Sequence, residues 1–255
     1  MRVRTTVVAA SALVLCLAVA GCGPDGAGDK DGKGSGKAAT SQPPASASAA
    51  PPEAAASPTP TSDGRTLTEA ELAKVALTTG EVPGYEVAPL EGTDERGTEK
   101  PEDEACRPIA AIINGSPEPA PAATVFRTVM DTAEEGKDDQ TVVTEILTSH
   151  PKGGAEELLR SVRDAVRACA GGFRTTSEDG PSTYTGVKTL PAPGAGQESF
   201  AYQVTGSLEG VRVPLVFHLV RTGSTVVTFY AANFLTETAP EVPAALVTAQ
   251  AAKLP

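Results

Sequence analysis

Apolar residues recur at steps of three and four along residues 153–173, the spacing that places them on one side of an α-helix. We therefore expect an amphipathic helix here that ends at Gly171, because glycine readily adopts the backbone conformation found after a helix. The buried stripe of this helix would consist of Ala155, Leu158, Leu159, Val162, Val166 and Cys169.

Three other segments carry helix signals. In TLTEAELAKVAL, Thr68 and Glu71 have the spacing of a capping box, and Leu67 can pack on Leu72. A second helix is expected in EDEACRPIAAIING, where the acidic start favours the helix dipole. One side of it would carry Cys106, Ile109 and Ile113. The last helix is expected in PEVPAALVTAQAAKL.

Alternating apolar and polar positions predict strands in most of the remaining chain. The clear ones are ATVFRTVMD, QTVVTEILTSH, QESFAYQVTG, VRVPLVFHLVR and STVVTFYAANF. Shorter ones are expected at the end of TGEVPGYEV and in STYTGVKTL, and an acidic turn would follow ATVFRTVMD. This set of elements predicts an α+β fold, an antiparallel sheet of about five to seven strands with helices packed on one face.

The last two strands form a predicted hairpin whose two faces differ in polarity. With a two-residue turn, one face carries Val213, Leu215, Phe217, Leu219, Val226, Tyr230 and Phe234. The other carries Arg212, Pro214, Val216, His218, Val220, Val227, Phe229 and Asn233. A mixed face of this kind is typical of a ligand cleft, so His218, Phe229, Asn233 and Arg212 are the candidate ligand-binding residues. The alternative is a sheet partly covered by its own loops.

The amino-terminal pattern indicates export and acylation. Arg2 and Arg4 precede an apolar run that is shorter than the ~20 residues of a membrane span. Small residues then precede Cys22, which predicts a lipoprotein signal peptide over residues 1–21 and a lipidated Cys22. The alternative is an ordinary secretory signal with an incidental cysteine. Two acyl chains would hold the protein on the outer face of the cell membrane.

Residues 22–65 are rich in Gly, Ala, Ser and Pro and contain no aromatic residue, which predicts a disordered tether. The folded domain is expected over residues 66–255, where all ten aromatic residues lie. This stretch has 27 acidic and 15 basic side chains, a net charge of -12. Such a charge argues against nucleic acid or an anionic membrane surface as the partner.

Two cysteines, Cys106 and Cys169, remain in the expected domain, so only one intramolecular bridge can form. Both fall on the buried sides of predicted helices, which favours a disulfide over two separate buried thiols. The sequence has no CxxC motif, so it gives no sign of redox chemistry.

Signals for catalysis, metals and cofactors are lacking in the sequence. The only histidines are His150 and His218, and no G-x-S-x-G motif accompanies them. Zinc-ligand spacing is absent, and the acidic runs lack the pattern of an EF-hand loop. The stretch GKGSGKA fails the phosphate-loop spacing. We therefore expect no catalytic residues, no metal and no cofactor.

Several segments together resemble actinobacterial lipoproteins with a PknH-like extracellular sensor domain. The resemblance covers about residues 66–254 and lies in LTTGEVPGY, VRDAVRACAGGF, QESFAY, RTGSTVVTF and ALVTAQAAKL, in that order. It implies an antiparallel α+β fold with a broad cleft for an unknown ligand, and a bridge between Cys169 and Cys106. The kinase-attached sensor domain has two bridges, whereas this domain has cysteines for one, and the chain has no kinase domain.

These observations favour an extracytoplasmic, non-catalytic lipoprotein with a sensor-like domain. Its partner would be a small ligand, a wall component or an envelope protein, besides the cytoplasmic membrane through the anchor. The alternative is a lipid or glycolipid carrier of the cell envelope, which requires an apolar cavity. A hydrolase of envelope polymers would need an acid–base pair that the sequence does not reveal.

Overall fold

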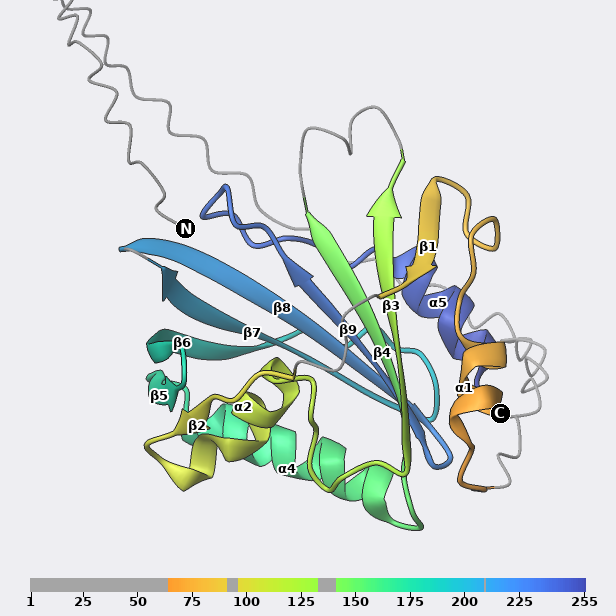
Figure 1. Cartoon of the computed structure of the whole chain (residues 1–255), viewed down its shortest axis with the longest axis horizontal. Helices are drawn as coiled ribbons and strands as arrows, with labels where there is room; N and C mark the ends of the chain where they lie inside the picture. The colour runs from red at the N-terminus through yellow and green to blue at the C-terminus, as the bar shows by residue number, and fades with distance from the viewer. Residues whose placement is uncertain (1–63, 91–95, 133–140, 209) are drawn as a thin grey trace, which may run out of the picture. The chain divides into compact units, whose positions relative to one another are not determined.

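The computed structural model of the chain describes residues 64–90, 96–132, 141–208 and 210–255, and Figure 1 shows how their elements are arranged. The predicted signal peptide, Cys22, nearly all of the tether and most of the acidic turn lie outside these ranges. The lipidation site and the domain boundaries therefore stay predictions.

The described residues form helices and strands of very different lengths. The helical elements are α1 (Glu69–Val75), η1 (Glu104–Cys106), α2 (Arg107–Ile113), α4 (Gly154–Ala168) and α5 (Ala244–Lys253). The strands are β1 (Tyr85–Pro89), β2 (Lys100–Pro101), β3 (Ala123–Asp131), β4 (Val142–Ser149), β5 (Phe173–Ser177), β6 (Gly180–Leu190), β7 (Glu198–Leu208), β8 (Val211–Thr222) and β9 (Thr225–Ala232).

The strands make one nine-stranded sheet in the order β1-β3-β4-β9-β8-β7-β6-β5-β2. Every neighbouring pair is antiparallel. The α+β prediction is confirmed, but the sheet is larger than the five to seven strands expected. The strands that the sequence did not reveal are β5 and β2, which have five and two residues and are too short to show a clear alternation.

Helices cover both faces of the sheet, so the expectation of one covered face was wrong. We call the side where α2 and α4 pack, against Phe217 and Val226 among others, the α4 face. The opposite side, where α1 and α5 pack against Val227 and Phe229, is the α5 face. Neighbouring residues of a strand point to opposite sides, so Val226 and Val227 belong to different cores. The expectation fails because polar residues on the α5 face, such as Glu145, are buried.

Local capping rules explain the start of α1 and the turn after α4. Thr68 and Glu71 form the predicted capping box, with the Thr68 backbone N–H donating to Glu71 Oε2 at 2.8 Å. After α4, which ends at Ala168, the residue with positive φ is Gly172 and not Gly171. A Cβ atom at Gly172 would lie 2.2 Å from the Tyr184 carbonyl oxygen, so only glycine fits there. Among the described helices, none has the length and apolar character needed to span a bilayer.

Candidate functional site

The β8–β9 hairpin has the register that the sequence predicts. Thr222 pairs with Thr225, which leaves a two-residue turn between the strands. His218 is the cross-strand partner of Phe229, and the two side chains lie on the α5 face. The division of the hairpin into two faces is therefore confirmed.

The ligand cleft expected on this face does not include an exposed Phe229. The Phe229 ring has 0% of its surface exposed and belongs to the core that includes Leu246 and Val247 of α5. His218 is half-buried, and burial lowers the pKa of its imidazole. Ligand contact through His218 stays a prediction, but Phe229 packs as a core residue.

The other two candidates lie away from this pair. Arg212 is exposed near the start of β8, six residues from His218 and hence about 20 Å away along an extended strand. Asn233 follows β9 and is buried, and its Oδ1 accepts a hydrogen bond from the Leu235 backbone N–H at 2.9 Å. The structure therefore brings His218 and Phe229 together, while Arg212 and Asn233 stand apart from them.

A hollow of about 670 Å³ lies instead beside α2, at the edge of the sheet where β2 is found. One wall is the extended segment 97–101, another is α2, and the turn after β5 closes a third side. Its lining residues are Gly97, Thr98, Glu99, Lys100, Pro101, Glu104, Arg107, Ala110, Ala111, Asn114, Ser116, Glu118, Thr176, Ser177 and Glu178.

Paired hydrogen bonds hold the extended wall to the end of α2. The Asn114 side-chain Nδ2 donates to the Glu99 carbonyl at 2.8 Å, and its Oδ1 accepts from the Glu99 N–H at 3.1 Å. The Gly97 N–H donates to the Asn114 carbonyl at 3.1 Å. Asn114 therefore fixes the separation between the two walls.

Hydroxyl groups from the sheet hold the same wall from the other side. The Glu99 carboxylate accepts hydrogen bonds from Thr175 Oγ1 at 3.1 Å, Ser182 Oγ at 2.8 Å and Tyr184 Oη at 2.7 Å. Burial raises the pKa of Tyr184, and its hydrogen bond to Glu99 adds to this effect. Tyr184 thus stays a neutral donor, and the wall is anchored to β5 and β6.

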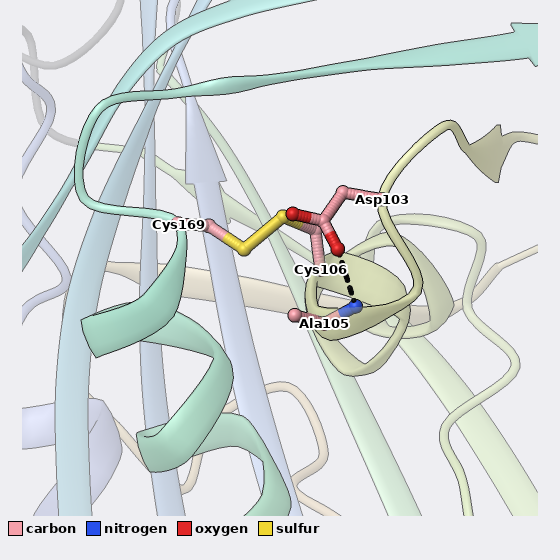
Figure 2. The surroundings of a disulfide bond; sticks show 4 residues. All are labelled: Asp103, Ala105, Cys106 and Cys169. Carbon is pink, nitrogen blue, oxygen red and sulfur yellow. Dashed lines mark hydrogen bonds between the residues drawn. A yellow bond between two sulfur atoms is a disulfide. The ribbon is translucent and has the colours of Figure 1, made fainter.

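The disulfide between Cys106 and Cys169 fixes the helical wall (Figure 2). Their Cα atoms lie 5.9 Å apart, and the bridge joins the start of α2 to the end of α4. Just before it, the Asp103 side chain accepts a hydrogen bond from the Ala105 N–H at 2.9 Å. The predicted bridge is therefore present, and it holds α2 in place at the end opposite Asn114.

A second hollow of about 490 Å³ lies between α2 and α4 and shares Glu104, Arg107 and Glu118 with the first. Arg107 Nε lies 3.4 Å from both Glu104 Oε2 and Glu118 Oε2. We call the two hollows together the α2 groove. Arg107 stands where they meet, so a ligand that spans both would contact its ion pairs.

The α2 groove is lined by carboxylates, basic side chains, hydroxyl groups and an amide. Neither histidine lines the groove. His150 is fully buried elsewhere, directly after the end of β4. Across the described ranges, no cluster of three or more His, Cys, Asp or Glu side chains could hold a metal ion. The groove was not predicted because its walls are a loop and the ends of a short helix, which leave no periodic signal.

Comparison with known proteins finds similarity in structure and none in sequence. No family model matches the chain, and no curated protein sequence matches it. Among solved structures, the chain is similar to the extracellular domain of PknH from Mycobacterium tuberculosis, with 12% identity and a TM-score of 0.49. The match covers 75% of this chain and 96% of that chain. Membership of the group that the sequence segments resemble stays a prediction.

Proposed function

We propose that the chain is a lipoprotein anchored through Cys22 outside the cytoplasmic membrane, and that its domain binds a ligand or partner without catalysing a reaction. The observation that carries the binding role is the α2 groove, whose walls are fixed by the disulfide, Asn114 and Glu99. A hollow with fixed walls loses little conformational freedom when a ligand enters, which favours binding.

The location outside the cytoplasm is supported by two features of the chain. The sequence before Cys22 has the pattern of a lipoprotein signal. The disulfide between Cys106 and Cys169 is of a kind that persists in oxidising compartments and is rare in the cytosol.

The charges of the groove favour a ligand that carries positive charge. Six acidic and three basic side chains line its two hollows. Arg107 is already paired with acids, and Arg160 forms an ion pair with Glu157. The uncompensated charge is therefore negative, and it attracts amine or guanidinium groups such as those of basic peptides and amine-bearing wall fragments.

Tri-lysine is a suitable probe of this site, and binding can be followed by backbone amide chemical shifts. We expect shifts at α2 and at residues 97–101, and an affinity reduced about two- to fivefold in Glu118→Gln, the effect of losing one exposed ion pair. The matched control is Glu86→Gln, which removes an exposed charge on β1. Shifts confined to other parts of the domain, or an equal loss in the control, contradict the site.

Native mass spectrometry of protein purified from its host tests the class of ligand. A bound basic peptide or wall fragment supports the proposal. A bound phospholipid or glycolipid supports the carrier function instead, and turnover of wall polymers contradicts the non-catalytic role.

A further inference from the structure

Glu145 of β4 is a carboxylic acid buried completely inside the domain. Its exposed fraction is 0%, and its cross-strand neighbours are Arg127 on β3 and Phe229 on β9. Like Phe229 it lies on the α5 face, so α1 and α5 cover it. The same row of the sheet continues from Phe229 to His218 on β8.

The side chain of Glu145 has no hydrogen-bond partner among the described residues. Both carboxylate oxygens are buried and unpaired. The Leu77 backbone N–H lies close enough to lower the pKa, but it forms no hydrogen bond of normal geometry to either oxygen. An ionised carboxylate in such a place loses its hydration and gains no hydrogen bond in return, which strongly disfavours the charged form.

The two cations that favour an ionised Glu145, Lys253 and Arg127, form hydrogen bonds to other groups. Lys253 of α5 donates to the Ala76 carbonyl at 2.8 Å and to the Glu81 carboxylate at 2.6 Å. Arg127 donates to the Phe126 carbonyl at 2.9 Å. Neither forms an ion pair with Glu145 in the part of the chain that the structure describes, so the buried charge would stay uncompensated.

Three charged side chains within the described ranges act on Glu145. Arg127 from β3 and Lys253 from α5 favour its charged form, and Glu81, from the segment after α1, disfavours it. The β9 neighbour Phe229 does not titrate. Burial outweighs the two cations and raises the pKa of Glu145 to about 7.

The cover above Glu145 is held by a few polar contacts between α1 and α5. Gln250 Nε2 donates to the Val75 carbonyl at 2.9 Å, next to the Lys253 bond to Ala76. The Gln250 Oε1 atom is buried without a donor among the described residues. A protonated carboxyl group can donate a hydrogen bond where an ionised one cannot, so protonation also gives the buried Glu145 a donor.

We propose that the protonation state of Glu145 controls how firmly α5 and the end of α1 are seated on the sheet. With Glu145 protonated, the helices stay packed over the row that runs from Arg127 to His218. With Glu145 ionised, the carboxylate draws water, α5 loosens, and the α5 face with His218 becomes accessible. The domain would thereby respond to the proton concentration outside the membrane. Only this last step depends on the proposed location.

The direction of the pH effect follows from proton binding. Glu145 binds a proton more tightly in the folded domain than in the unfolded chain, where its pKa is near the ordinary 4.5 of a glutamate. Its contribution to stability is therefore fully present below pH 4.5 and is lost as the pH rises through about 7. The difference in pKa corresponds to a change of up to about 300-fold in the unfolding equilibrium constant.

Urea unfolding of the wild type and of Glu145→Gln, from pH 4 to 8.5, isolates this contribution as the difference between the two proteins. Near pH 4 we expect the two proteins to have similar stability. Above pH 7 we expect the unfolding equilibrium constant of Glu145→Gln to be smaller than that of the wild type, by up to about 300-fold. The control is Glu86→Gln, which removes an exposed carboxylate from β1. A pH-independent difference between wild type and Glu145→Gln overturns the proposal.

Hydrogen exchange separates a loosened helix from a uniform loss of stability. Amide protection in α5, corrected for intrinsic exchange rates, should fall in the wild type between pH 6 and 8 and stay constant in Glu145→Gln. Protection in α4 should change less than that in α5. Equal changes in α4 and α5 overturn the role of α5. Neither measurement uses a ligand, so failure here is distinct from failure of the α2 groove to bind.

Discussion

The side chain of Gln250 donates a hydrogen bond to the backbone carbonyl of Val75 at 2.9 Å, and this contact joins two residues 175 positions apart in the sequence. It ties the last helix of the domain to the end of the first. Both helices lie on the α5 face and cover that side of the sheet together.

Gln250→Leu should destabilise the domain while preserving the volume of the side chain. The substitution leaves the part-buried Val75 carbonyl without its donor but also removes the unpaired Gln250 Oε1, so we expect a loss of about 1 kcal/mol in the free energy of unfolding, the low end of the range for an unsatisfied backbone group. Urea denaturation measures the loss. Thr248→Ala, an exposed change on the same helix, is the control and should alter the stability little. Wild-type stability for Gln250→Leu contradicts a role for this contact.

Replacing both bridge cysteines, in Cys106→Ala/Cys169→Ala, should lower the free energy of unfolding by about 4 kcal/mol. The bridge closes a loop with a sequence separation of 63, and opening it restores the conformational entropy of that loop in the unfolded chain. Either single substitution should have nearly the same effect, since one cysteine alone cannot form the bridge. Denaturation of the reduced wild type provides the reference, and its midpoint should approach that of the double variant.

Phe229→Ala should reduce stability by about 3–5 kcal/mol, the range for truncating a large core aromatic residue. The ring is fully buried, so the substitution leaves a cavity under α5. His218→Ala, at the half-buried partner position, should have a smaller effect. Thermal or urea unfolding of the two variants distinguishes a core position from a surface one, and equal losses contradict the assignment of Phe229 to the core.

Several features of the domain could be predicted from the sequence because local rules decide them. The capping box of Thr68 and Glu71 is a short-range pattern, and it forms as expected. The hairpin register follows from the two-residue turn between Thr222 and Thr225. The bridge between Cys106 and Cys169 follows from their number and from their places on helix stripes.

The covered α5 face and the α2 groove depend on long-range packing and could not be predicted in this way. Glu145 and His218 interrupt the apolar pattern, which normally indicates exposure, yet Glu145 is buried by helices that are distant in sequence. The groove depends on Asn114 meeting Glu99 across a loop, a contact that neither residue type signals by itself.

Acidification should destabilise the domain through His150, which is completely buried. Burial lowers the pKa of His150 to about 4 from 6.5, so the unfolded chain takes up a proton first as the pH falls. Stability is therefore lost between pH 6.5 and 4, by up to about 3 kcal/mol. The difference between wild type and His150→Gln measures it. The pH dependence of this difference should run opposite to that for Glu145, since it develops as the pH falls and not as it rises, and a flat profile contradicts the prediction.

Cys22→Ala should abolish attachment to the membrane if the thiol carries the lipid. Without that sulfur no diacylglycerol thioether can form, and the remaining apolar run is shorter than the ~20 residues that hold a spanning helix in the bilayer. Labelled palmitate should enter the wild type and not the variant, and fractionation should show the wild type with the membranes. Cys16→Ala, inside the predicted signal peptide, is the matched control and should be labelled normally. Equal labelling of Cys22→Ala and wild type contradicts acylation at Cys22.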